Sequence, residues 1–403
     1  MKRELKALAL DKISLHCVDQ LNQMGITVRV ENKMSADELA AAIGQCHLLL
    51  VRSATKVTPE LLKRAKKLLA VGRGGVGMDN INIKVATELG IVTFNTPGAN
   101  AESVAECTLS MILAAMHDLS SGQQAMNHLV WNKNQCHGRS LQCKTVGIIG
   151  LGAVGKWLSK MLEPFNVRQI CYDNAPATAL PWVPLLDLDD VLGQADVISL
   201  NLPLTSQTHH IINAEKLKKV KPGAIIVNSA RGELVDENAI VEALRSSRLR
   251  AYATDVYSNE PPDFTKDAFF AYPDLRQEGK LILTPHTYAS SDDAQDNVAK
   301  VLAEQAIRYL IRGEMPWGAN FPNFSLPRQS QSRLLVFHPD AKGMMSGIAE
   351  VVKGFVNVAA CINQRIDKGN MAYTIVDIDG PIKPEMVENI RKTNGVCRVH
   401  WVQ

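Results

Sequence analysis

The sequence Thr145-Val-Gly-Ile-Ile-Gly-Leu-Gly-Ala-Val-Gly155 is an apolar strand pattern that runs directly into glycines with the spacing G-x-G-x-x-G. Gly150 permits a sharp turn from strand to helix, Gly152 allows a pyrophosphate to approach the backbone, and Gly155 allows the helix to pack on the strand. The N-terminus of the following helix offers N–H groups and the positive end of its dipole to that anion. Taken alone, the same spacing also fits an ordinary tight turn.

The residues that follow the glycines favour a nucleotide site over a simple turn. An amphipathic helix pattern comes next, and a second apolar strand at 169–172 then ends at Asp173. An acidic residue about 20 positions after such glycines hydrogen-bonds a ribose diol and repels a 2′-phosphate. The segment therefore predicts a site for a nicotinamide dinucleotide, with NAD preferred over NADP.

The composition is that of a globular protein with no strong electrostatic partner. The chain has 403 residues, enough for two or three domains, and its net charge of +3 favours neither nucleic acid nor a membrane as the main partner. We find no signal-peptide pattern and no apolar run of about 18 residues, so we expect no membrane-spanning helix. The eight cysteines are scattered, which suggests a reducing compartment and, by default, the cytoplasm. No His/Cys cluster has metal-ligand spacing, so we expect no metal site.

Residues 1 to about 95 alternate short apolar strands with helices. A strand at 48–51 ends at Arg52 and Ser53, and a strand at 68–71 runs into Gly72-Arg-Gly-Gly-Val-Gly77. The N–H groups of such a glycine loop can face an anion. Arg52 and Arg73 would lie at the carboxyl ends of adjacent parallel strands, where two guanidinium groups suit a carboxylate or a phosphate. A flexible turn with surface arginines is the alternative.

The second half of the chain predicts a parallel sheet with candidate chemistry at one edge. Apolar strands at 195–200, 223–228, 250–255 and 281–284 alternate with helices, a pattern typical of a sheet covered on both faces.

Arg231, Glu260 and His286 follow three successive strands of this series. A 2-oxo acid needs a planar donor for its carboxylate and a proton donor near its carbonyl oxygen, and a carboxylate behind a histidine favours the protonated imidazole. Each residue alone has an ordinary structural explanation, but three at successive strand ends favour a common site.

The sequence pattern changes after about residue 320. Residues 321–332 resemble a linker, and residues 333–403 predict the order strand, helix, strand, strand, helix, strand. This is a small α+β module of the split-βαβ type. Since it carries no catalytic cluster, we expect it to sense a ligand or to mediate assembly.

Together these segments resemble the D-isomer-specific 2-hydroxyacid dehydrogenases, and among them the members that act on a phosphorylated acid and end in an ACT domain. Arg73 within the glycine loop is the feature most similar to those members. The resembling stretches span nearly the whole chain: 71–80, 95–106, 145–155, 228–236, 255–262 and 284–286.

The resemblance implies an α/β fold with a discontinuous substrate domain. A Rossmann-type doubly wound parallel sheet would be inserted into a flavodoxin-like α/β substrate domain, and an α+β ferredoxin-like ACT domain would follow. The expected ranges are 1–95 with 286–320 for the substrate domain, 96–285 for the NAD-binding domain, 321–332 for the linker and 333–403 for the ACT domain. Domain closure around the substrate, and a homodimer or homotetramer, are also implied.

The resemblance further implies roles for single residues. His286 would be the general acid/base, Glu260 its partner and Arg231 the residue that orients the substrate. The expected cofactor contacts are Gly150, Gly152, Ala153, Val154, Gly155, Asp173, Ser229, Ala230, Asp255 and Val76. The expected substrate contacts are Arg52, Ser53, Arg73, Gly75, Val76, Asn100 and Lys133, the last from a neighbouring subunit. The positions matching a bound amino-acid effector are His338, Asp340 and Asn357, although Asp340 stands where regulated relatives have asparagine.

The implied reaction is the oxidation of 3-phospho-D-glycerate to 3-phosphohydroxypyruvate with NAD, the first step of serine biosynthesis. Two alternatives stay open. One is the reduction of another 2-oxo acid, such as hydroxypyruvate or 2-oxoglutarate. The other is a regulatory protein that senses NAD, which would not need the set formed by Arg231, Glu260 and His286.

Overall fold

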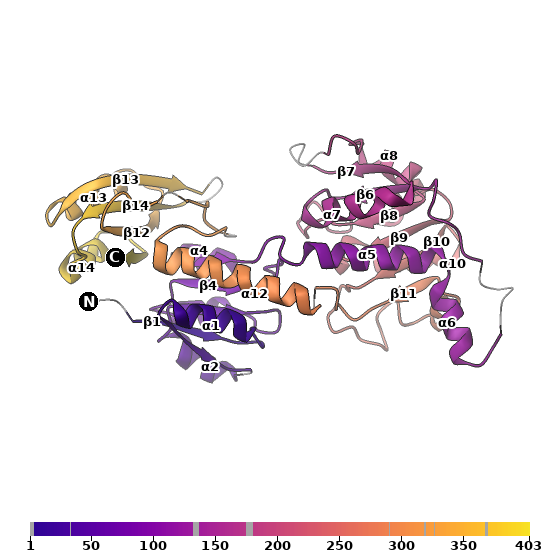
Figure 1. Ribbon diagram of the computed structural model, residues 1–403, viewed down its shortest axis with the longest axis horizontal. Coiled ribbons are helices and arrows are strands. Elements are labelled where there is room, and N and C mark those ends of the chain that lie inside the picture. Colours follow the sequence, from indigo (N-terminus) through magenta and orange to yellow (C-terminus); the bar gives the residue numbers. More distant parts are fainter. Residues whose placement is uncertain are drawn as a thin grey trace. The chain divides into compact units, whose positions relative to one another are not determined.

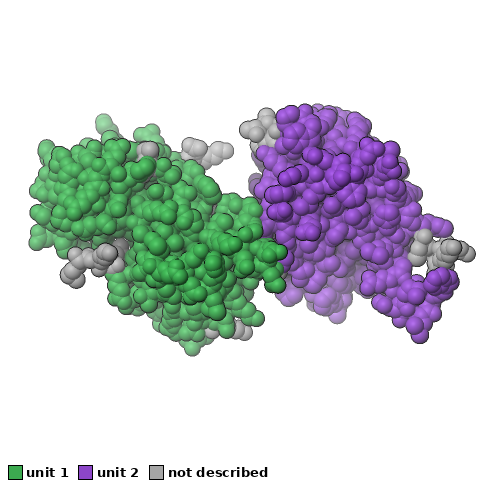
Figure 2. Space-filling view, in the orientation of Figure 1, with its two compact units in different colours: residues 1–99, 292–403 green, residues 100–291 purple. Residues whose placement is uncertain are grey.

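The computed structural model describes residues 4–32, 34–131, 137–174, 180–289, 291–317, 320–325, 327–366 and 370–403 (Figure 1). The chain forms two compact units (Figure 2). Unit 1 comprises residues 1–99 and 292–403, and unit 2 comprises residues 100–291.

The N-terminal part of unit 1 is a five-stranded parallel sheet in the order β2-β1-β3-β4-β5. Its strands are β1 Leu5–Ala9, β2 Ile26–Val30, β3 Leu48–Val51, β4 Ala70–Arg73 and β5 Val92–Phe94. Its helices are α1 Leu15–Gln23, α2 Ala36–Ile43, α3 Pro59–Arg64, α4 Ile83–Glu88 and the returning α12 Asp292–Ile307, which ends in a π-helical turn at Arg308–Arg312. This strand order is that of flavodoxin-like folds, which confirms the predicted class.

The C-terminal module, residues 332–403, is an antiparallel sheet in the order β13-β14-β12-β15. Its elements follow the predicted βαββαβ sequence: β12 Ser332–Pro339, α13 Met344–Lys353, β13 Asn357–Arg365, β14 Met371–Asp379, α14 Pro384–Lys392 and β15 Arg398–Val402. This is the ferredoxin-like arrangement. Alternate residues of β12 face opposite sides of the sheet. Leu334 and Val336 pack under the module's own helices, whereas Leu335 and Phe337 join the core that β1, β5 and α12 also form.

The module is therefore seated directly on the N-terminal sheet of unit 1. Gly90, at φ +65°, leaves so little room that an added Cβ would lie 2.8 Å from Phe337 Cβ. His400 Nε2 donates to the carbonyl of Tyr309 at 3.1 Å. Phe321 and Phe324, in the expected linker, are buried in the shared core. The domain boundaries expected from the sequence stay predictions.

Unit 2 is a six-stranded, all-parallel sheet in the order β11-β10-β9-β8-β6-β7. Its strands are β6 Thr145–Ile149, β7 Arg168–Tyr172, β8 Val197–Leu200, β9 Ala224–Asn228, β10 Leu249–Thr254 and β11 Leu281–Leu283. Its helices are α5 Ala101–Met116, α6 Leu119–Asn127, α7 Ala153–Leu162, α8 Leu188–Gln194, α9 Ala214–Lys219, α10 Glu237–Arg245 and α11 Pro273–Gln277, with 3₁₀ turns at Glu163–Phe165 and Gly232–Leu234.

Two separate apolar cores lie on the two faces of this sheet, as a doubly wound fold requires. The strand order reverses between β6 and β8, which makes their carboxyl ends the usual ligand site of such a sheet. The predicted Rossmann-type sheet is confirmed. Among the described residues, no helix is long and apolar enough to cross a membrane.

A buried ion pair lies within the module, and its arginine also contacts the chain that leads into the module. Arg333 Nε and Nη2 donate to the two carboxylate oxygens of Asp377 at 2.6 and 2.9 Å, and both side chains are only 2% exposed. Arg333 also donates to the carbonyl of Gly313 at 3.3 Å. The two partners face each other on adjacent strands β12 and β14, so the pair is fixed by the strand register.

We predict that Asp377→Ala lowers the free energy of unfolding by about 3–5 kcal/mol, because it leaves a buried guanidinium without its carboxylate. Urea denaturation followed by circular dichroism measures this. The double variant Arg333→Met/Asp377→Leu removes both charges, and we expect it to recover most of the loss. A single-variant loss below about 1 kcal/mol would show that the pair does not stabilise the module.

Candidate active site

The three glycines after β6 perform distinct structural tasks. Gly150 has φ +96°, and an added Cβ would lie 2.7 Å from the carbonyl oxygen of Asn201, so no other residue fits the turn. A Cβ on Gly155 would lie 2.2 Å from the carbonyl oxygen of Gly150, which fixes the packing of α7 on the turn. A Cβ on Gly152 would meet nothing within 4 Å. The space above Gly152 is therefore open for a ligand.

The surroundings of this turn fit a dinucleotide. Gly152 is the N-cap of α7, and no side chain among the described residues caps that helix, so its first N–H groups face outward, as the predicted contacts Ala153 and Val154 require. Asp173 follows β7, and its carboxylate accepts the N–H of Leu151 at 2.7 Å. This bond fixes the acidic side chain beside the glycine turn. Its ribose contact stays a prediction.

A histidine–carboxylate pair lies at the opposite end of the same sheet edge. His286 follows β11, and its Nδ1 donates to Glu260 Oε2 at 2.7 Å. The other oxygen of Glu260 accepts the N–H of Tyr257 at 3.1 Å. The hydrogen bond with Glu260 raises the pKa of His286, and burial opposes this only in part. Burial by itself would raise the pKa of Glu260, but the hydrogen bond and charge of His286 lower it overall.

Asp255 braces the segment that carries His286. Its buried carboxylate accepts the Thr284 hydroxyl at 2.6 Å and the N–H groups of Thr287 and Tyr288, both at 3.1 Å. These bonds hold His286 in a left-handed conformation, with φ +51°. The sequence suggested Asp255 as a cofactor contact, and the structure shows its oxygens engaged with this loop. Its position at the end of β10, next to β11, is the signal that could have indicated the bracing role.

Arg231 completes the group at the ends of three adjacent strands, β9, β10 and β11. The Asn228 amide donates to the carbonyl of Arg231 at 2.8 Å and its oxygen accepts the N–H of Ala230 at 3.1 Å, which shapes the turn after β9. The hydroxyls of Ser229 and Thr108 share a hydrogen bond of 2.7 Å. The charge of Arg231 acts on both His286 and Glu260. Arg231, Glu260 and His286, which the sequence places after successive strands, therefore follow three neighbouring strands of the sheet.

Within unit 1, the strand register places Arg73 directly opposite Val51, the residue before Arg52. Asp11 was not anticipated from the sequence, yet its carboxylate accepts the N–H groups of Arg52 and Thr55 at 2.9 and 3.0 Å and so fixes the loop that carries Arg52 and Ser53.

The glycine loop after β4 is more closed than expected. An added Cβ on Gly75 would lie 2.2 Å from a guanidinium nitrogen of Arg73, so the arginine folds over the loop. The N–H of Gly75 donates to the Thr96 hydroxyl at 3.0 Å, whereas Val76 is exposed. The Gly75 N–H could therefore bind a substrate carboxylate, as predicted, only after its hydrogen bond to Thr96 breaks.

Asn100 is buried at the N-cap of α5 in unit 2. Lys133 lies outside the described residues.

Among the described residues, no group of three His, Cys, Asp or Glu side chains could hold a metal ion. The seven cysteines described are all free. The cytoplasmic location stays a prediction.

The effector positions do not converge within one chain. His338 is buried and bonded through Nε2 to the Thr374 hydroxyl at 2.8 Å, and Asp340 pairs with Arg365 at 3.2 Å. Asn357 donates to Asp379 at 2.6 Å. The register pairs His338 with one end of β14 and Asn357 with its other end.

Comparison with known proteins identifies the family. Residues 109–287 match the family model for the D-isomer specific 2-hydroxyacid dehydrogenase, NAD binding domain. D-3-phosphoglycerate dehydrogenase of Haemophilus influenzae is 30% identical over 402 residues, which cover 98% of this chain and 97% of that protein. The chain belongs to the D-isomer-specific 2-hydroxyacid dehydrogenase family. Hydroxypyruvate reductase of Thermotoga maritima is 37% identical over 306 residues, covering 75% of this chain and 96% of that one.

A solved structure agrees in fold. The NAD⁺-bound 3-phosphoglycerate dehydrogenase of Entamoeba histolytica is 25% identical, with a TM-score of 0.67, and the match covers 79% of this chain and 99% of that one. The chain spans less than two thirds of some other relatives named D-3-phosphoglycerate dehydrogenase, at 66% and 57% of two archaeal proteins.

The raised pKa of His286 can be tested directly. Glu260→Gln replaces the carboxylate with a neutral amide of the same shape, so we expect the pKa of His286 to fall towards its ordinary value of 6.5. Because the folded-state pKa is the higher one, the protonated imidazole favours folding below about pH 6.5, and this contribution is lost as the pH rises through the folded pKa. NMR titration of the His286 imidazole signals measures this pKa in the wild type and in Glu260→Gln.

The exposed Glu242 on α10 supplies the control, and Glu242→Gln should leave the midpoint of His286 unchanged. Equal midpoints in wild type and Glu260→Gln would show that the carboxylate does not set the pKa of this histidine.

Proposed function

We propose that this protein oxidises 3-phospho-D-glycerate to 3-phosphohydroxypyruvate with NAD. The observation that carries the proposal is the His286–Glu260 pair, with Arg231 beside it, at the carboxyl edge of a sheet that belongs to the NAD-binding domain family. The Haemophilus influenzae relative, matched over nearly its whole length, supports the substrate.

In the proposed mechanism His286 removes the proton of the substrate's 2-hydroxyl group. Its Nδ1 is bonded to Glu260, so Nε2 is the nitrogen that faces the hydroxyl. Glu260 then stabilises the imidazolium, because a fixed carboxylate favours the charged ring. NAD, held at the glycine turn after β6, would supply the hydride acceptor for C2. The neutral imidazole is needed for oxidation, so the rate of oxidation should rise with pH through the raised pKa of His286.

The remaining groups would bind and orient the two reactants. Arg231 can offer a planar pair of N–H donors to the substrate carboxylate. Gly152 and the N-terminus of α7 would hold the pyrophosphate of NAD, and Asp173 would bind its ribose. Arg52 and Arg73, at the ends of adjacent strands β3 and β4, would bind the phosphate of the substrate.

A second candidate is the reduction of hydroxypyruvate, which the Thermotoga maritima relative favours. Both reactions use the same histidine, carboxylate and arginine. They differ in whether the substrate carries a phosphate, so the two arginines of unit 1 distinguish them.

We expect NADH formation at alkaline pH with 3-phospho-D-glycerate, and little with D-glycerate or D-2-hydroxyglutarate. His286→Ala should lower kcat by about 10²–10⁴-fold, because the proton transfer loses its base. NADH absorbance measures the turnover. Preferred turnover of D-glycerate would favour the hydroxypyruvate reaction, and binding of NAD without any turnover would favour a sensor.

Arginine variants test the phosphate contact within the same assay. Arg52→Ala and Arg73→Ala should each lower kcat/KM for the phosphorylated acid by about tenfold or more, since each removes a charge-assisted hydrogen bond. The exposed Arg29 on β2 offers a matched control, and Arg29→Ala should have no effect. Equal losses with phosphorylated and unphosphorylated acids would contradict phosphate recognition.

We further propose that two copies associate through α6 and the residues after it. α6 extends away from the body of unit 2 (Figure 1). This segment exposes apolar side chains that a monomer would leave in water: Leu119, Met126, Leu129, Val130 and Trp131. An amino-acid effector at the C-terminal module would also need an assembly, because His338 and Asn357 lie far apart along β14 of one chain.

Leu129 and Trp131 are 94% and 80% exposed, so their replacement should not disturb the fold. We expect Leu129→Asp/Trp131→Asp to convert a dimer into a monomer in sedimentation velocity. Leu15→Asp on α1, which is exposed at 69%, should leave the assembly intact. An unchanged mass in the double variant would exclude this interface.

A further inference from the structure

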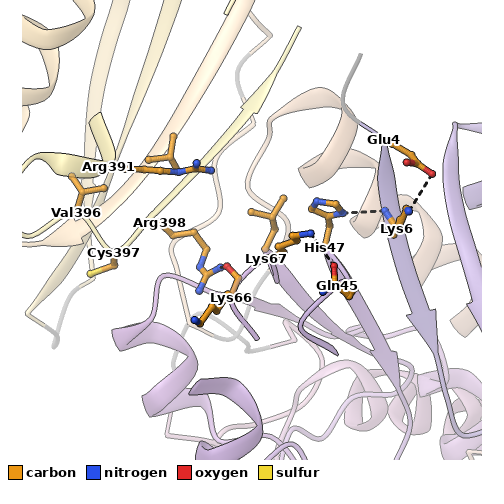
Figure 3. A pocket seen from close by; sticks show the side chains of 12 residues that line it. Glu4, Lys6, Gln45, His47, Lys66, Lys67, Arg391, Val396, Cys397 and Arg398 are labelled. Carbon is orange, nitrogen blue, oxygen red and sulfur yellow. Dashed lines mark hydrogen bonds and ion pairs between the residues drawn. The ribbon is translucent and has the colours of Figure 1, made fainter. Parts of the chain in front are cut away.

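A pocket lies in unit 1, where the C-terminal module meets the N-terminal sheet (Figure 3). Its volume of about 790 Å³ is within the range of small-molecule sites. The pocket is lined on one side by β1 and the segments before β3 and β4, and on the other by α14 and β15. None of the residues assigned above to the cofactor or the substrate lines it.

The lining carries a strong excess of positive charge. Its charged side chains are Lys6, Lys66, Lys67, Arg391, Arg398 and Glu4, which gives five cations against one carboxylate. This local excess of four exceeds the net charge of +3 of the whole chain. Within the part of the chain that the structure describes, Glu4 pairs with Lys6 alone, at 3.5 Å, and both side chains are more than half exposed, so that pair compensates little.

The cations next to the module have few acidic partners of their own. Lys67 donates to the neutral amide of Gln45 at 2.9 Å, and Arg391 donates to Glu388 outside the pocket. Among the described residues, no carboxylate forms an ion pair with Lys66, Lys67 or Arg398. Figure 3 shows Arg398 reaching across from β15 towards Lys66. Like charges therefore face each other from the two sides of the pocket.

Arg398 both contributes positive charge to the pocket and contacts the N-terminal part of unit 1. Its guanidinium donates to the carbonyls of Leu89, Lys66 and Leu68 at 2.9, 3.1 and 2.5 Å. Carbonyl dipoles satisfy its hydrogen bonds but carry no net charge, and burial lowers its pKa. The positive charge at the seam is therefore held in place by the docking itself, and a mobile anion is the component that would neutralise it.

We propose that this pocket binds a small, multiply charged anion, such as a polyphosphate or a polycarboxylate, and that the bound anion strengthens the docking of the C-terminal module. The charge excess calls for several negative charges on one ligand. The predominance of lysine and arginine in the lining favours oxyanion groups over an apolar ligand. The proposal is independent of the reaction proposed above, since it uses none of the same residues.

The test uses the full chain and inorganic tripolyphosphate at constant ionic strength. Calorimetric titration is carried out in the Arg52→Ala/Arg73→Ala background with excess NAD, which removes the other phosphate-binding groups. We expect binding of one tripolyphosphate per chain and a rise in Tm. Lys66→Glu/Lys67→Glu should weaken binding by about tenfold or more, because two charge-assisted contacts are reversed. Lys63→Glu, on the neighbouring α3, should bind as the background does.

The charge reversal has a second readout that does not depend on the ligand. If the lysines repel the cations around them, Lys66→Glu/Lys67→Glu should have a higher Tm than the background when no anion is present. Competition with citrate then compares the two classes of anion: displacement shows that the site also accepts a polycarboxylate, and its absence shows that the site selects a polyphosphate. No binding of either anion, or binding that the double reversal leaves unchanged, would overturn the proposal.

Discussion

The carboxylate of Asp255 is the interaction on which the candidate active site depends. It is buried between the ends of β10 and β11, and it accepts three hydrogen bonds from Thr284, Thr287 and Tyr288. A buried carboxylate is costly unless it is hydrogen-bonded, so this loop and this side chain stabilise each other. The consequence is a histidine held at an unusual backbone conformation, with its Nδ1 directed at Glu260. His286, the proposed base, is thus positioned by a residue that need not touch the substrate.

Much of this could be predicted from the sequence, because parallel strands place their carboxyl ends at one edge. Once the apolar strands were located, Arg231, Glu260 and His286 were expected at one edge, and the glycine spacing predicted the turn after the strand at 145–149, whereas the strand-order reversal beside that turn comes from the structure. The position of Asp255 at the end of β10 is a usable signal, but its hydrogen-bond partners and the bracing by Asp11 could not be predicted in this way. Each depends on which backbone N–H groups face a carboxylate across a loop, and residue patterns do not specify loop geometry. The engagement of the Gly75 N–H by Thr96 escaped prediction for the same reason.

The C-terminal module illustrates a second limit of sequence patterns. The sequence pattern predicted the βαββαβ order of the module, but not that the second face of its sheet is apolar and packs on the rest of unit 1. A sheet with helices on one face needs another cover for the opposite face if that face is also apolar. Leu335, Phe337 and Tyr373 supply such a face, and the N-terminal sheet and α12 cover it. A single continuous core therefore joins segments from both ends of the chain, and the fold of the N-terminal sheet is coupled to that of the module.

Two arginines of the module, the buried Arg333 and the partly buried Arg398, contact the rest of unit 1 in different ways. Arg333 is neutralised by Asp377, so its charge stabilises the module only as half of a pair. Arg398 instead donates to the carbonyl of Leu89, the C-cap residue of α4, where the helix dipole is negative, and to the carbonyls of Lys66 and Leu68 in the segment between α3 and β4. The end of a helix dipole carries only about half an elementary charge. Its interaction with a cation contributes about 0.3–1 kcal/mol in exposed settings, so it offsets only part of the charge of Arg398. Arg398 thus anchors the module while leaving a residual positive field beside Lys66 and Lys67. Docking of the module and affinity for an anion consequently depend on the same residue. Arg398 holds the module against the N-terminal part of unit 1 and also adds positive charge to the pocket beside it.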